Sequence, residues 1–150
     1  MFRIFAVAVL ALIAAQPAIA ADLTVTDAYA RSGNPNTGAA FMTVMNAGET
    51  PDRLVEARSD VARKTELHTH VISDGIARMR PVDAIEIPAG GEARLERGGD
   101  HDMFIGLHEP LPPGATFPVE LVFESGRSLT VELTVEGPGG GMGHGGAATE

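Results

Sequence analysis

The stretch KTELHTHVISDGIARMRPV, residues Lys64 to Val82, decides which fold this chain adopts. Two runs rich in strand-forming side chains, 64–71 and 76–82, flank the cluster Ser73-Asp74-Gly75. Polar turn residues between two such runs are typical of a β-hairpin. The stretch therefore predicts two antiparallel strands joined by a tight turn.

The same pattern of short apolar runs separated by Gly, Pro, Asn and Asp clusters continues on both sides of this hairpin. Further strands are expected at 23–26, 39–46, 53–59, 85–87, 93–95, 101–107, 117–124 and 128–135. Residues 31–38 (RSGNPNTG) are expected to form a loop, and 59–64 is the one candidate for a helical turn. Roughly nine or ten short strands at this spacing predict an all-β, Greek-key β-sandwich or barrel.

The N-terminal 20 residues have the pattern of a secretory signal peptide. Arg3 supplies a positive charge, residues 4–15 are apolar, and Ala18-Ile19-Ala20 offers small residues before a cleavage point. The apolar run is shorter than the ~20 residues of a bilayer span. We therefore expect cleavage after Ala20 and no stable membrane insertion afterwards, in preference to a retained anchor. A domain at 21–136 and a disordered Gly-rich tail at 137–150 (GPGGGMGHGGAATE) follow.

The composition limits the classes of partner and ligand. The formal net charge is −9, and loss of Arg3 with the leader would make it −10. Such a charge argues against a nucleic acid or an anionic membrane surface as the partner, whereas it favours solubility and suits cations or a basic patch on a partner. The chain has no cysteine, so it has neither disulfides nor thiolate ligands. Thioethers do not form disulfides, so a soft metal site built from Met and His suits an oxidising compartment.

Histidine and methionine concentrate in the region from Glu66 to Leu107. His101 and Met103 are two residues apart on an expected strand, so their side chains should share one face, with Asp102 on the other. His68, His70 and Met79 lie on the predicted hairpin. Imidazole and thioether together favour a soft transition metal, above all Cu(I).

The hairpin register leaves two partners open for Met79. A hairpin centred between Ser73 and Asp74 places His68 opposite Met79, whereas a two-residue Asp74-Gly75 turn places His70 there. Opposed residues have Cβ atoms ~4.5–5.5 Å apart, close enough to share one ion. His68 and His70 occupy the same face, so residue spacing alone does not choose between them.

The donor types exclude several other sites. Zinc prefers thiolate, imidazole or carboxylate, and calcium and magnesium prefer oxygen. A blue-copper electron-transfer site needs a cysteine, and the chain carries no G-x-S-x-G motif of a serine hydrolase. His108 is expected to be exposed and structural. Holding and handing over copper is the favoured function, with a copper-dependent redox enzyme and a metal-free binding module as alternatives.

The sequence resembles the PCuAC-type periplasmic copper chaperones. Their pattern of His, ten residues, Met, twenty-one residues and His-x-Met is met by His68, Met79, His101 and Met103. The segments AAFMTVMN, ELHTH, DGIARMRPV and GGDHDMFIGL also resemble the family, over roughly residues 21–135. The residue between the last two donors is often apolar in the family and is Asp102 here.

The resemblance implies a cupredoxin-like β-sandwich that is not an enzyme and binds one Cu(I) through these four side chains. It also implies delivery in the periplasm to a copper-accepting protein, such as another copper chaperone or subunit II of cytochrome c oxidase with its dinuclear copper centre. Some members carry a C-terminal Met/His-rich extension that binds further copper. Met142 and His144 are therefore accessory candidates for a second copper, Cu(II), and His70 is an accessory candidate beside the main site.

Overall fold

The computed structural model describes residues 22–138 as an all-β domain. The strands in chain order are β1 (Leu23–Asn34), β2 (Thr37–Asn46), β3 (Asp52–Arg58), β4 (Ala62–Ser73), β5 (Ile76–Pro81), β6 (Ile85–Ile87), β7 (Glu92–Leu95), β8 (His101–Leu107), β9 (Thr116–Phe123) and β10 (Ser128–Val135). This part of the chain contains no helix that is long and apolar enough to cross a membrane.

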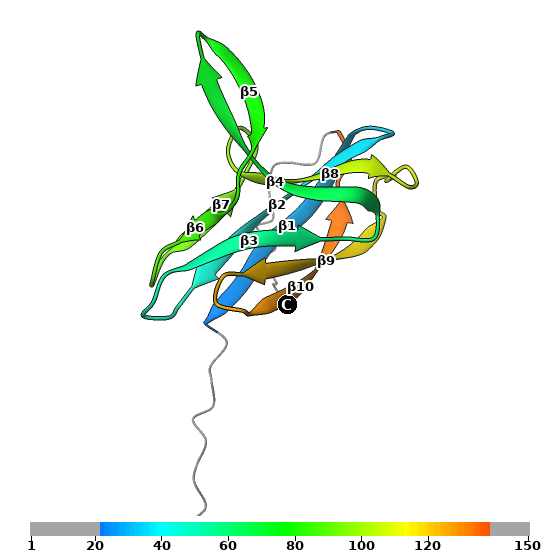
Figure 1. The fold of residues 1–150 in the computed structure, drawn as a ribbon. Helices are drawn as coiled ribbons and strands as arrows, with labels where there is room; N and C mark the ends of the chain where they lie inside the picture. Colours follow the sequence, from blue (N-terminus) through cyan, green and yellow to red (C-terminus); the bar gives the residue numbers. More distant parts are fainter. Residues whose placement is uncertain (1–21, 139–150) are drawn as a thin grey trace, which may run out of the picture.

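The strands form two packed layers that are joined through β1. One layer has the order β5-β4-β8-β2-β1, and the other continues as β10-β9-β3-β6. β1 pairs antiparallel with β2 of the first layer and parallel with β10 of the second. The hydrogen-bonded sheet bends at β1, so that its two halves face each other (Figure 1). The short strand β7 pairs with β2 beside β8. The prediction of an all-β sandwich is confirmed.

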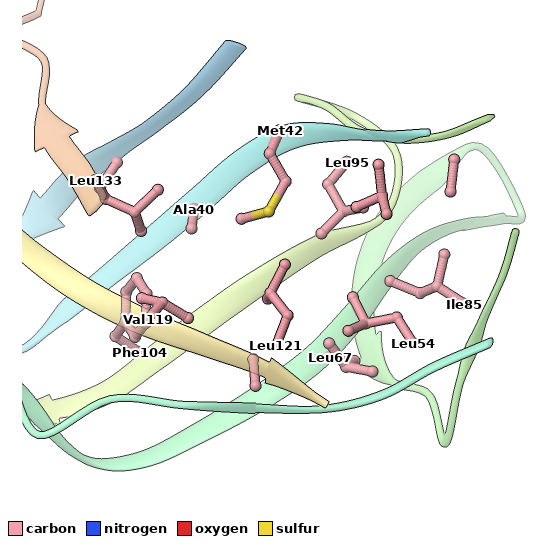
Figure 2. Close-up of a cluster of buried hydrophobic side chains, with 14 of the residues drawn as sticks. Ala40, Met42, Leu54, Leu67, Ile85, Leu95, Phe104, Val119, Leu121 and Leu133 are labelled. Atoms are coloured by element: carbon pink, nitrogen blue, oxygen red, sulfur yellow. The ribbon is translucent and has the colours of Figure 1, made fainter. Parts of the chain in front are cut away.

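Apolar side chains from both layers fill the space between them (Figure 2). Leu67 of β4 and Phe104 of β8 point into this core from one layer, and Val119 and Leu121 of β9 point into it from the other. Each buried side chain of this size contributes about 1.5–3 kcal/mol relative to exposure. Because side chains alternate along a strand, the neighbours of Leu67 and Phe104 lie on the outer face of the layer.

Two local predictions are wrong. Residues 31–38 are not a loop, because β1 runs to Asn34 and β2 begins at Thr37, with Arg31 opposite Ala39. The Asn34 side chain tightens the turn by accepting hydrogen bonds from the backbone N–H groups of Asn36 (2.9 Å) and Thr37 (3.0 Å). The segment 59–64 holds a turn at 60–61 and the start of β4 in place of a helical turn. Polar loop-forming residues thus occupy strand positions because cross-strand pairing satisfies their backbone groups.

The outer parts of β4 and β5 project from the sandwich as a two-stranded arm, defined here as residues 70–81 (Figure 1). β5 is an edge strand, and every residue of it is exposed. Asp74 and Gly75 form the turn with φ values of 53° and 74°. A two-residue hairpin turn of type I′ needs positive φ at both central residues, and Asp-Gly supplies it. The arm therefore has a locally determined register.

Candidate metal centre

The turn at the tip of the arm decides which histidine faces Met79. With Asp74-Gly75 as the two-residue turn, Ser73 pairs with Ile76 and His70 pairs with Met79. His68 instead lies opposite Pro81. Of the two registers that the sequence allows, the one centred between Ser73 and Asp74 is wrong. His68 is therefore a diagonal neighbour of Met79.

Pairing between β4 and β8 brings the remaining donors onto the same outer face. His68 lies opposite His101, and Glu66 lies opposite Met103. On the far side of β8, Met103 lies opposite Ala39 of β2, a small residue that leaves room beside the thioether. The β4–β5 hairpin and the more distant strand β8 thus place imidazole and thioether groups in adjacent registers.

The three imidazoles lie close together around His101. Its ring centroid is 5.8 Å from that of His68 and 5.2 Å from that of His70. Phe41 covers another side, with its ring centroid 6.2 Å from that of His101. His68 and His101 are buried, with exposed fractions of 8% and 3%, whereas Met79 is 51% exposed. The cluster therefore has a buried imidazole base and an accessible thioether.

Hydrogen bonds orient the rings and leave nitrogen lone pairs free. The Gly99 carbonyl oxygen lies 3.0 Å from Nδ1 of His101 and 3.3 Å from Nδ1 of His70. A carbonyl oxygen only accepts, so both contacts require Nδ1–H and leave Nε2 unprotonated in the neutral rings. Burial lowers the pKa of His101, which favours the neutral form that binds metals.

His68 is held by a different partner. Its Nε2 lies 3.0 Å from a carboxylate oxygen of Glu66, and Glu66 also pairs with Lys64. The hydrogen bond from His68 and then the one from Lys64 lower the pKa of the Glu66 carboxyl, so it is ionised and accepts from Nε2–H. Nδ1 of His68 is buried and has no hydrogen-bond partner in the described structure. A buried lone pair without a partner is costly, and a metal ion would satisfy it.

Two hollows open onto the cluster. A cavity of about 790 Å³ is lined by Met79, His101 and Met103, together with the β1–β2 turn and the prolines at 110–113. A second, of about 520 Å³, is lined by His70, Met79 and His101. Met79 and His101 border both, so the space between these two side chains is reachable from solvent.

The sequence of residues 23–135 matches the family described as putative lipoprotein LpqE-like. The chain belongs to the LpqE-like family. A relative of this LpqE-like chain, the putative lipoprotein Lxx21020 of Leifsonia xyli subsp. xyli, is 33% identical to it over 113 residues. The match covers 75% of this chain and 68% of the relative.

Solved structures share the fold of the LpqE-like chain. The Cu(I) form of DR1885 from Deinococcus radiodurans is 38% identical, with a TM-score of 0.61 and coverage of 79% of this chain and 83% of that one. The apo form is 35% identical, with a TM-score of 0.60 and coverage of 91% and 94%. The copper-bound PCuAC domain of PmoF2, 24% identical, has a TM-score of 0.65 and coverage of 78% and 94%. The resemblance to PCuAC domains inferred from the sequence is confirmed, and the LpqE-like chain is homologous to copper-binding domains.

The candidate metal ligands of the LpqE-like chain include methionines. Among residues 22–138, no group of three or more His, Asp or Glu side chains is arranged to hold a metal ion. The thioethers of Met79 and Met103 are further candidate ligands, because they line the same cavity as His101. Neutral sulfur ligands favour Cu(I) over hard ions, so the side chains present fit a Cu(I) cargo.

Sequence reasoning missed Glu66 as a member of the cluster. Its carboxylate orients His68, and its position opposite Met103 places it at the border of the donor set. The signal was available, because Glu66, His68 and His70 are spaced by two residues and share one strand face. Carboxylates that hold a ligand imidazole in orientation are common around metal sites.

The other predicted residues are placed as follows. Asp102 points away from the donors and is fully buried, with no hydrogen-bond partner for either carboxylate oxygen in the described structure. His108 is exposed just beyond the end of β8. Met142, His144 and the leader at 1–20 lie outside the described residues.

Proposed function

We propose that this protein binds one Cu(I) as cargo through His68, Met79, His101 and Met103 and transfers it to another protein. One observation carries the proposal: the β4–β5 and β4–β8 registers gather two imidazoles and two thioethers on one strand face. Met79, His101 and Met103 of this set line a cavity that is open to solvent. DR1885, which is 38% identical to this chain and has a solved Cu(I) structure, supports the choice of metal. His70 stands beside this set as an accessory imidazole.

The arrangement suits release as well as binding. His68 and His101 are anchored by Glu66 and by the Gly99 carbonyl, whereas Met79 lies on an exposed edge strand. A neutral thioether is a weaker ligand for copper than a thiolate. Met79 is therefore the donor that an incoming thiolate of an acceptor replaces first. The protein itself performs no turnover in this scheme.

The setting that we propose is the periplasm. The leader pattern at 1–20, the absence of cysteine and the lipoprotein names of the family and of the Leifsonia relative support export. The acceptor that we propose is another copper chaperone or the dinuclear copper centre of cytochrome c oxidase. Met142 and His144 are proposed as a separate Cu(II) site.

The test is a competition titration of Cu(I) with a chromogenic chelator, combined with X-ray absorption spectroscopy of the loaded protein. Met79→Ala and Met103→Ala should each weaken Cu(I) binding by at least about tenfold, equivalent to about 1.4 kcal/mol. Met45→Ala is the matched control, because Met45 is a partly exposed methionine of β2 that does not line the cavities bordered by Met79. A wild-type absorption spectrum without sulfur scattering, or unchanged affinity in both variants, would refute the site. Copper-dependent turnover would favour the redox-enzyme alternative.

A further inference from the structure

The arm carries most of the exposed large hydrophobic side chains of the described chain. The large hydrophobic residues that are exposed are Ile72 (79%), Ile76 (53%), Met79 (51%) and Met45 (43%), and the first three belong to the arm. Ile72 follows His70 on the same strand face, next to Met79. An apolar surface therefore continues outward from the proposed copper donors. Ile76 lies on the opposite face of the arm. Exposed apolar residues on a projecting element are typical of a protein-protein contact.

The arm also differs in charge from the rest of the chain. Residues 72–81 contain two arginines and one aspartate, a net charge of +1, in a chain of −9. Ion pairs among residues 22–138 involve Arg53, Arg58, Lys64, Arg94 and Arg127. Outside the arm, Arg31 and Arg63 take part in none within these residues. Arg78 and Arg80 of β5 take part in no ion pair within residues 22–138, and neither does Arg97. Arg97 lines both hollows beside Met79 and His101.

Protection of an edge strand accounts for only part of this pattern. Arginine on an exposed edge discourages pairing with other chains. Ile72 and Ile76, exposed on the same hairpin, have the opposite effect, because they add apolar surface to that edge. Arg97 lies outside β5 altogether. The hairpin register places Ile72 and Met79 on one face of the arm and Ile76, Arg78 and Arg80 on the other. An arm that exposes apolar and arginine side chains on its two faces has the composition expected of an element that a partner contacts from both sides.

We propose that the arm, with Arg97, is the docking surface for an acidic copper-accepting protein. This inference rests on the proposed function and adds the chemistry of the acceptor to it. Ile72 on one face of the arm and Ile76 on the other would contact the apolar walls of a groove in the partner. Arg78, Arg80 and Arg97 would pair with carboxylates at the borders of that groove. Met79 lies within the surface, so docking places the acceptor beside the most exposed copper donor.

The acidic remainder of the chain gives this arrangement directionality. An acidic acceptor is repelled by a chain of −9 from most directions and attracted by the local arginines at the arm. The attraction acts over about one Debye length, ~8–10 Å at physiological salt, so it orients the partner during the final approach. Encounter through the arm is thereby favoured over encounter through the sandwich.

The test uses two synthetic acceptor peptides that share one two-cysteine Cu(I) site and differ only in flanking residues, four glutamates or four lysines. Stopped-flow transfer of Cu(I) from the full-length protein is measured at low and high salt. The wild type should transfer to the glutamate peptide about tenfold faster at low salt, and high salt should remove the difference. The net charge of −9 alone predicts the opposite preference, so faster transfer to the lysine peptide would overturn the proposal.

Substitutions in the arm test whether its side chains cause the preference for the glutamate peptide. Arg78→Glu/Arg80→Glu should reverse the peptide preference with an unchanged Cu(I) affinity. Arg58→Glu/Arg127→Glu, which changes the net charge equally in the other layer, should leave the preference intact, and the same reversal in this control would overturn the proposal. Ile72→Ser/Ile76→Ser should slow transfer to both peptides, and it should leave sedimentation unchanged. Loss of a wild-type dimer in this variant would instead assign the arm to a second copy of the chain.

NMR shifts of the metal-free protein separate this inference from the proposed function. Binding of the glutamate peptide should shift amide signals of residues 70–81 without copper present. If those shifts occur but Cu(I) is not bound, the proposed function fails and the docking surface stands. If Cu(I) binds normally and the shifts fall elsewhere on the protein, the docking surface is wrong and the copper function stands.

Discussion

His70 lies directly opposite Met79 across the β4–β5 hairpin, whereas His68 lies opposite His101 across the β4–β8 pair. The two imidazoles share a strand face but have different surroundings. His68 is buried and bonded to Glu66, and its Nδ1 has no hydrogen-bond partner among residues 22–138, whereas His70 is partly exposed and bonded to the Gly99 carbonyl. The position of His68 suits a permanent ligand, and that of His70 suits an accessory one.

Substitution of each histidine separates these two roles. His68→Ala should lower the Cu(I) affinity by at least about tenfold, or about 1.4 kcal/mol, because it removes a proposed donor. His70→Ala should change the Cu(I) affinity by less than about threefold, because its partly exposed ring is an accessory to the four proposed donors. Chelator competition measures both values. A larger loss for His70→Ala would make His70 the partner of Met79 that the hairpin register places there.

The Glu66 carboxylate should matter to copper binding although it is not a proposed donor. Glu66→Gln removes the negative charge that accepts the Nε2–H of His68 and should reduce the Cu(I) affinity by roughly 10-fold, the lower end for groups that orient a ligand. Glu56→Gln is the matched control, because Glu56 pairs with exposed Arg58 on β3, in the other layer. Equal affinities for both variants and the wild type would remove Glu66 from the site.

Asp102 should make the stability of the metal-free protein pH-dependent. Burial raises the pKa of its carboxyl to about 7 from an ordinary 3.8, so the folded state holds this proton more tightly than the unfolded state. The associated stability is fully present below pH 3.8 and is lost as the pH rises through about 7. The loss amounts to about 4 kcal/mol, from roughly three pKa units at 1.36 kcal/mol each.

Urea denaturation between pH 4 and pH 8 measures this dependence. Asp102→Asn removes the titrating group and should flatten the curve over this range. Asp102→Val replaces an unpaired buried carboxylate by an apolar group and should be more stable than the wild type at pH 8. A wild-type stability that does not decrease between pH 5 and pH 8 would contradict the raised pKa.

The turn at the tip of the arm should control the geometry at Met79. Gly75 has a φ of +74°, where a side chain is strained, so Gly75→Ala should destabilise the hairpin by about 1 kcal/mol. Because the turn sets the register, the Cu(I) affinity should also fall. Gly33→Ala is the control, since Gly33 lies in β1 with open space at its Cβ position and no positive φ. Hydrogen exchange of the β5 amides and Cu(I) titration test both effects.

Local sequence patterns predicted most strands and failed where a segment's structure depends on distant partners. The alternation of His101, Asp102 and Met103 correctly placed Asp102 on the inner face. The polar stretch at 31–38 was predicted to be a loop, yet Arg31 pairs with Ala39 and the segment continues β1 and β2. Its composition is typical of loops, but the neighbouring strand supplies the backbone hydrogen bonds that make it a hairpin.

The sequence by itself determined the donor types, their strand faces and the soft character of the metal that they suit, because residue chemistry and the two-residue period of a strand are local properties. Only the tertiary structure decided that Met79 faces His70 and that His68 meets His101 and Glu66. It also decided that Asp102 has no partner in the described core. Register and burial depend on which strands pair and pack, and those contacts join residues that are far apart along the chain.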